Sequence, residues 1–261
     1  FPLLVGQNLV SITDRGRHAR HDARSTPTAG PINSPHWETE PSAHDPLTVV
    51  LFHSMFGLRP VELSAAERLR GRGHRVLTPD LFAGSVVAGH GSAPALEDGF
   101  ALMERIGWDT IMARARAAVR DLPADTVLGG FSMGVGVIGS LWPDRLAAAG
   151  VFLLHATTIV PEGIPLGTPV QAHVAAGDRF APPDQLAAYQ ASSAHARAEA
   201  TLHSYPGTGH FYTDSSLPDH DPDATHRTWQ HIDGLLHWTR SRRHLPHRTG
   251  ADDVAVEALD R

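Results

Sequence analysis

Three side chains along the sequence could together perform nucleophilic catalysis. Ser132 stands in the run Gly130-Phe131-Ser132-Met133-Gly134, which fits the pattern Gly-x-Ser-x-Gly, and Asp178 and His210 follow it in that order. In this pattern the serine occupies a tight turn between a strand and a helix, where small neighbours permit close packing. A serine hydroxyl needs a base to accept its proton, and a carboxylate to orient that base. The sequence therefore predicts Ser132 as nucleophile, His210 as base and Asp178 as the orienting acid.

Two backbone N–H groups are also needed to stabilise the negative charge that develops on the substrate oxygen. One normally comes from the residue after the nucleophile, here Met133, and the other from the loop after an early strand. That loop is residues 53–57, and Met55 is the candidate donor. His155 either lines the pocket or is a satisfied histidine at the sheet edge. The candidate pocket residues are Ser54, Phe56, His155 and Phe211.

Strand-like and helix-like segments alternate along the chain, and this arrangement must position the three side chains. Strands are expected at 47–52, 75–78, 125–129, 151–154, 170–175 and 201–205. Helices are expected around 63–69 and 108–121, from the serine turn through 141, and at 183–196 and 222–240. Such alternation predicts an α/β fold with a mostly parallel sheet and helices on both faces. Ligands bind at the carboxyl ends of strands in such sheets, and each of the three candidate residues closely follows a strand.

The composition excludes several classes of chemistry. The chain has 261 residues, 41% hydrophobic and 19% charged, with a net charge of -6, and it contains no cysteine and no lysine. Thiolate catalysis, cysteine metal sites and Schiff-base chemistry are therefore excluded. We expect no cofactor, no metal, no nucleic-acid partner and no membrane segment. We expect a small-molecule substrate and a cytoplasmic location; a monomer and a homodimer both remain open.

The chain is expected to hold one folded domain between two tails. Residues 1–45 are rich in Arg, His, Pro, Ser and Thr and predict a disordered leader. Residues 46–241 form the expected domain, and 242–261 a C-terminal tail. Residues 83–107 are a candidate for a lid-like insertion over the pocket. Because the first methionine is Met55, we expect a fragment or an unusual start, and the apolar first residues lack the basic region of a signal peptide.

Together these segments resemble the dienelactone hydrolase family of α/β-hydrolases over about residues 47–240. The resemblance implies an α/β-hydrolase fold and cofactor-free hydrolysis. It is carried by residues 52–58, by the Thr-Pro-Asp-Leu-Phe run at 78–82, by Gly130–Gly134, by Gly177-Asp178, by Gly209-His210-Phe211 and by residues 218–222.

The chain departs from the founding members of that family at three positions. Ser132 replaces their cysteine nucleophile, and Ser54 replaces a glutamate that contacts the resting cysteine. Asp214 stands where they place an arginine that holds the substrate carboxylate. Because an acidic side chain repels a carboxylate, we expect a neutral or cationic ester, or another acyl compound, as substrate.

We expect a serine hydrolase that cleaves an ester-like bond of a small molecule through an acyl-enzyme. A thioesterase, an amidase or a carbon–carbon hydrolase could use the same three residues. A non-catalytic binding protein with this fold is the alternative of another class, and reaction with a fluorophosphonate probe distinguishes it from an enzyme.

Overall fold

A computed structural model describes residues 46–87 and 93–243. The predicted leader at 1–45 and the tail beyond residue 243 lie outside the described residues. The described part contains one sheet, whose strands are β1 (Thr48–Phe52), β2 (Arg75–Leu77), β3 (Val127–Phe131), β4 (Val151–Leu154), β5 (Pro169–Ala175) and β6 (Glu199–Tyr205).

The strands lie in the order β2-β1-β3-β4-β5-β6, and every neighbouring pair is parallel. In the middle of the sheet Val50 pairs with Leu128, and Leu128 with Val151. These central strands are apolar on both faces, as expected of a parallel sheet covered on both sides. The predicted parallel α/β sheet is confirmed.

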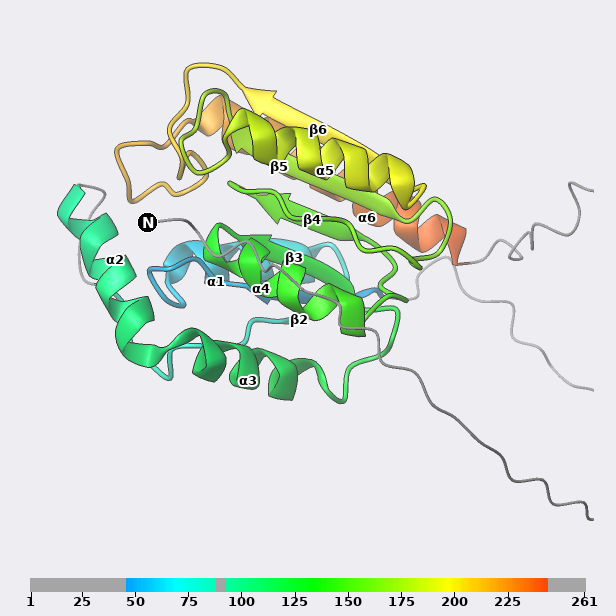
Figure 1. The fold of residues 1–261 in the computed structure, drawn as a ribbon, viewed down its shortest axis with the longest axis horizontal. Coiled ribbons are helices and arrows are strands. Elements are labelled where there is room, and N and C mark those ends of the chain that lie inside the picture. The colour runs from blue at the N-terminus through cyan, green and yellow to red at the C-terminus, as the bar shows by residue number, and fades with distance from the viewer. Residues whose placement is uncertain (1–45, 88–92, 244–261) are drawn as a thin grey trace, which may run out of the picture. The chain divides into compact units, whose positions relative to one another are not determined.

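Helices cover both faces of this sheet, as Figure 1 shows. They are α1 (Pro60–Gly71), α2 (Ala93–Ile106), α3 (Trp108–Val119), α4 (Met133–Leu141), the short 3-10 helix η1 (Trp142–Asp144), α5 (Pro183–His195) and α6 (Pro222–Arg242). The helices α3, α4 and α5 lie on one face, and α1 and α6 lie on the other (Figure 1).

Two apolar clusters fill the space between the sheet and its helices. Alternate residues of β1 belong to different clusters: Val50 packs with the α3 and α4 side, whereas Val49 and Leu51 pack with α1 and α6. This division follows from the strand period of two, which sends successive side chains to opposite faces. Both faces of the sheet are therefore buried, and its carboxyl edge is left to carry the polar site.

Sequence reasoning placed the strands and most helices within a few residues of their observed bounds, but it missed α2. That helix occupies residues 93–106, within the segment considered as a lid. Figure 1 shows α2 at the edge of the sheet toward which the strands point. Among the described helices, none is both long and apolar enough to span a bilayer.

Candidate active site

The turn after β3 holds Ser132 in a conformation that few residues adopt. Ser132 has φ 48° and ψ -103°, and α4 begins at the next residue. Its N–H donates to the carbonyl oxygen of Leu154 at 2.8 Å, which ties the turn to β4. A side chain on Gly134 would place its Cβ 2.5 Å from the carbonyl oxygen of Phe52, so this position requires glycine. The strained turn thus packs directly against the end of β1.

The three candidate side chains meet in one hydrogen-bonded chain. The Ser132 Oγ lies 2.9 Å from the Nε2 of His210, and the Nδ1 of His210 lies 2.5 Å from the Oδ2 of Asp178. The side chains of His210 and Asp178 are 8% and 3% exposed, respectively. With Nδ1–H donated to the carboxylate, Nε2 is left to accept the serine proton. This arrangement can activate a hydroxyl for attack on a carbonyl carbon.

Two further contacts fix the loops that carry these groups. The second carboxylate oxygen of Asp178 accepts the backbone N–H of Phe180 at 2.9 Å. The N–H of Phe211 donates to Asp219 at 3.1 Å, and a Cβ on Gly209 would lie only 2.4 Å from the carboxylate carbon of Asp219. Both the acid and the base are therefore held by main-chain contacts as well as by each other.

Aromatic rings form the wall around His210. The ring of Phe180 lies 4.7 Å from that of His210, and the ring of Phe211 lies 4.4 Å from it at a nearly perpendicular angle. The guanidinium of Arg179 stacks over Phe180 on the exposed side, at 4.7 Å from the ring centre. These rings offer an apolar surface next to His210 that apolar substrate groups could contact.

His155 is a buried neighbour of the site and lies 5.6 Å, between ring centres, from His210. Its Nε2 lies 2.9 Å from the Thr213 hydroxyl. Burial lowers the pKa of His155 well below its usual value, and nearby His210 and His173 lower it further. His155 is therefore neutral near pH 7 and places no positive charge beside the site.

The loop between β1 and α1 holds Met55, the predicted second oxyanion donor. Met55 is 5% exposed, and within the described residues its backbone N–H has no protein acceptor. The other predicted donor, the N–H of Met133, belongs to the first residue of α4, where no intrahelical acceptor exists. Both amides therefore belong to segments that meet where Gly134 packs against Phe52.

The predicted pocket residues Ser54, Phe56, His155 and Phe211 are all buried. Ser54, His155 and Phe211 border a cavity of about 10 Å³. Phe56 packs against Phe211, with ring centres 4.8 Å apart. This cavity borders neither Ser132 nor His210, so the role of these four residues in a substrate pocket stays a prediction.

The segment considered as a lid contacts this region through α2. A Cβ on Gly99 would come within 2.7 Å of the Met55 side chain and 3.3 Å of the Phe56 ring. The ring of Phe100, which is 41% exposed, lies 6.4 Å from that of Phe180. The helix therefore packs against Met55 and Phe56 in the loop after β1, and its Phe100 ring lies near that of Phe180.

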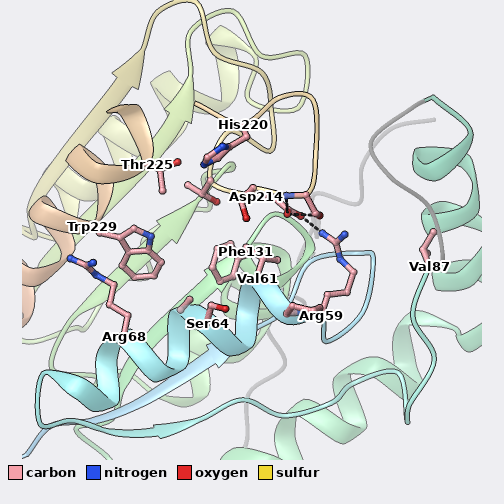
Figure 2. A pocket seen from close by; sticks show the side chains of 15 residues that line it. Arg59, Val61, Ser64, Arg68, Val87, Phe131, Asp214, His220, Thr225 and Trp229 are labelled. Atoms are coloured by element: carbon pink, nitrogen blue, oxygen red, sulfur yellow. Dashed lines mark hydrogen bonds and ion pairs between the residues drawn. The ribbon is translucent and has the colours of Figure 1, made fainter. Parts of the chain in front are cut away.

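Asp214 does not present a free negative charge to the site, contrary to the reasoning from sequence. It is 2% exposed, pairs with the guanidinium of Arg59, and accepts both the N–H and the hydroxyl of Ser216. Figure 2 shows Arg59 and Asp214 pointing toward each other. Because the charge of Asp214 is offset within the protein, its presence gives no physical reason to exclude an anionic substrate.

A larger pocket of about 790 Å³ lies elsewhere, between α1 and the segment that leads into α6 (Figure 2). Its lining includes Val61, Ser64 and Trp229, but neither Ser132 nor His210. It is therefore separate from the candidate reaction centre. In the described part of the chain, no group of three or more His, Asp or Glu side chains is arranged to hold a metal ion.

Sequence reasoning missed a buried carboxylate beside the loop between β1 and α1. Glu62 is 1% exposed and accepts hydrogen bonds from Ser54 and Arg59. A glutamate three residues after a helix start is a capping signal, and this spacing from Arg59 could have drawn attention to it. The partnership with Ser54 has no signal in the sequence because eight residues separate the two.

The parallel sheet, the strained serine turn and the placement of the three side chains define an α/β-hydrolase-type protein. The sequence matches the dienelactone hydrolase family over residues 37–238, and the chain belongs to that family. It is a hydrolase that acts on ester bonds. A comparison with curated proteins found no match.

Solved structures of similar fold include members and relatives of this family. One is a dienelactone hydrolase-like promiscuous phosphotriesterase from metagenomic libraries, with a TM-score of 0.58 at 20% identity, covering 77% of this chain and 89% of the other. A putative dienelactone hydrolase from Klebsiella pneumoniae subsp. pneumoniae gives 0.56 at 16% identity, covering 73% and 87%. At these identities the likeness is one of fold.

Proposed function

We propose that this protein hydrolyses a small-molecule carboxylic ester through an acyl-enzyme formed on Ser132. The observation that carries this proposal is the hydrogen-bonded chain from Ser132 through His210 to Asp178. The strained φ of Ser132 supports the same role, since strain at a serine turn exposes the hydroxyl at the sheet edge.

In the first half of the reaction, the Ser132 Oγ attacks the carbonyl carbon while its proton passes to the Nε2 of His210. The carbonyl oxygen becomes an oxyanion, which accepts hydrogen bonds from the N–H groups of Met55 and Met133. Each such donor contributes about 10²–10³ in rate. Asp178 stabilises the imidazolium through Nδ1–H. His210 then gives the proton to the leaving alkoxide, and an acyl ester of Ser132 remains.

In the second half, His210 takes a proton from water as the water oxygen attacks the acyl carbon. The second oxyanion collapses, the bond to the Ser132 Oγ breaks, and His210 returns the proton to that oxygen. The products are an alcohol and a carboxylic acid. The aromatic rings of Phe180 and Phe211 support a substrate with apolar groups next to the carbonyl.

The test uses a fluorophosphonate probe and peptide mass spectrometry on the wild type and Ser132→Ala. We expect one adduct, on Ser132, and a loss of at least about 10³ in kcat for p-nitrophenyl butyrate in the variant. Ser140→Ala, on the same helix, serves as the matched control and should retain both labelling and turnover. Circular dichroism verifies that all three proteins are folded.

Pre-steady-state kinetics tests the acyl-enzyme itself. A burst of p-nitrophenol equal to the enzyme concentration is expected where deacylation is slow. Matched thioester and amide substrates then rank the bond types that the same residues could cleave. Absence of labelling and of turnover in the folded wild type would overturn the proposal and favour a binding protein.

A further inference from the structure

Glu62 is a buried carboxylate that takes no part in the reaction proposed above. It is the third residue of α1 and is 1% exposed. One oxygen, Oε1, accepts the backbone N–H of Ser54 at 3.2 Å and the hydroxyl of Ser54 at 2.9 Å. The other, Oε2, accepts the N–H of Arg59 at 3.0 Å. Every one of these donors belongs to the segment that connects β1 to α1.

Burying this carboxylate costs desolvation free energy, and its hydrogen bonds and the nearby charge of Arg59 offset that cost only in part. Burial raises the pKa of Glu62, while the nearby Arg59 charge and the hydrogen bonds from Ser54 and Arg59 lower it. Apolar side chains of similar size fill such positions without a desolvation penalty. A carboxylate here therefore calls for a reason beyond packing, and its partners indicate what that reason is.

Ser54, the residue that Glu62 holds, precedes one peptide group of interest, the one between Ser54 and Met55, which His53 and Gly57 also hold. The N–H and hydroxyl of Ser54 are held by Glu62. The carbonyl oxygen of Ser54 accepts the N–H of Gly57 at 3.2 Å and lies 2.7 Å from the Nδ1 of His53. Because the Nε2 of His53 accepts the N–H of Leu81 at 3.0 Å, its Nδ1 carries the proton and donates to Ser54.

The planarity of the peptide bond connects these contacts to the reaction. In a trans peptide, the C=O of one residue and the N–H of the next point in opposite directions. With the Ser54 carbonyl held by His53 and Gly57, the N–H of Met55 must point the other way. A rotation of this peptide would turn a carbonyl oxygen toward the place where a donor is required. The Glu62 contacts oppose that rotation by holding the preceding residue at two atoms.

The same carboxylate also reaches the loop that carries His210. The Oε2 of Glu62 accepts the backbone N–H of Arg59. The side-chain guanidinium of the same Arg59 pairs with Asp214. Asp214 lies four residues after His210, and Figure 2 shows the pair meeting between α1 and that loop. A buried network thus joins the segment that holds the Met55 amide to the segment that holds the proposed base.

We infer that Glu62 is a positioning residue that sets the direction of the Met55 N–H and so completes the oxyanion hole. The inference rests on the proposed function, since it assigns Met55 as the second donor. Loss of one whole donor lowers kcat by about 10²–10³. Misdirection of the donor in a Glu62 variant is expected to lower kcat by about 10–100-fold while KM changes less than about twofold.

The test compares three substitutions. Glu62→Met removes every acceptor at nearly the same volume and is expected to show the full loss. Glu62→Gln keeps an acceptor for Ser54 and is expected to recover most of the activity. Ser54→Ala removes the hydroxyl that donates to Glu62 and accepts the N–H of Phe56, but keeps the backbone contact to Glu62, and should lower kcat by about 2–10-fold. Glu67→Gln, an exposed position on the same helix, is the matched control and should match the wild type.

A transition-state analogue separates positioning from a general loss of structure. A trifluoromethyl ketone forms a hemiketal with the proposed nucleophile, and its oxyanion occupies the hole. Its Ki should rise in Glu62→Met by the same factor as kcat falls, whereas the Ki of a non-hydrolysable amide of the same shape should change less than about twofold. Thermal midpoints measured in parallel show that the variants are folded at the assay temperature.

The outcomes distinguish this inference from the proposed function. Lack of turnover and of Ser132 labelling in the wild type would remove the proposed function itself. An active wild type with unchanged kcat and unchanged ketone affinity in folded Glu62→Met would overturn the inference alone. If Glu62→Met does not fold, unchanged kcat and unchanged ketone affinity in Ser54→Ala, where a loss is expected, would overturn it too.

Discussion

Two buried carboxylates lie near the carboxyl edge of the sheet, and they contact opposite kinds of group. Asp178 accepts a ring N–H from His210 at 2.5 Å and one backbone amide. Glu62 accepts two backbone amides and a hydroxyl, all of them neutral. The same functional group is thus placed to orient a side-chain base in one case and a main-chain loop in the other. Under the proposed function, one carboxylate would serve the chemistry and the other the geometry of the backbone.

The largest effect is expected from a substitution of Asp178, the carboxylate that contacts His210. Asp178→Asn presents an amide where the His210 Nδ1–H needs an acceptor, which favours the wrong tautomer. We expect kcat to fall by about 10⁴-fold with the fold retained. Steady-state kinetics with p-nitrophenyl butyrate measures the loss, and Asp184→Asn, an exposed position nearby, is the control. A loss smaller than tenfold would show that Asp178 does not orient the base.

A second prediction concerns the ion pair between Asp214 and Arg59, the residue whose backbone N–H Glu62 accepts. The Arg59 and Asp214 side chains are 10% and 4% exposed, and Asp214→Leu leaves the guanidinium buried without its partner. We expect a loss of about 3–5 kcal/mol in the free energy of unfolding, measured by urea denaturation.

The double variant Arg59→Met/Asp214→Leu provides the matching control. Removing both charges avoids an unpaired buried ion, so the double variant should be more stable than Asp214→Leu alone. If the single variant loses less than about 1 kcal/mol, the pair is not a buried support for this region.

The same comparison explains what could be predicted from the sequence. Ser132, Asp178 and His210 each follow a strand, and the carboxyl ends of parallel strands lie at one edge of the sheet. The order of strands along the chain was therefore enough to predict that these three residues lie close together. The bond from Glu62 to Ser54 and the pair between Arg59 and Asp214 depend on side-chain packing between loops, which no periodicity encodes. The helix α2 was missed although apolar residues recur in it at helical spacing, as at Leu96, Met103 and Ile106, because the segment was considered only as a lid. The charge of Asp214 was misread because a sequence does not reveal which partner offsets it.

The smallest expected effect is the pH dependence of the stability that Glu62 contributes. Burial raises the pKa of Glu62 above its unfolded value of about 4.5. Between these two values the folded state binds more protons than the unfolded state, so the stability contributed by Glu62 is full below the unfolded pKa. It is then lost as the pH rises through the folded pKa. Glu62→Gln cannot ionise and has no such dependence.

The stability of the wild type relative to Glu62→Gln should therefore decrease as the pH rises above 4.5. The slope cannot exceed about 1.4 kcal/mol per pH unit for one group. Urea denaturation of both proteins at matched pH values measures it, and all other titrating groups are common to the two and largely cancel. Glu67→Gln replaces a glutamate that is exposed on the same helix, and its difference from the wild type should stay flat. A flat difference for Glu62→Gln as well would mean that water reaches its carboxylate, and that the loop before α1 is held less firmly than its hydrogen bonds indicate.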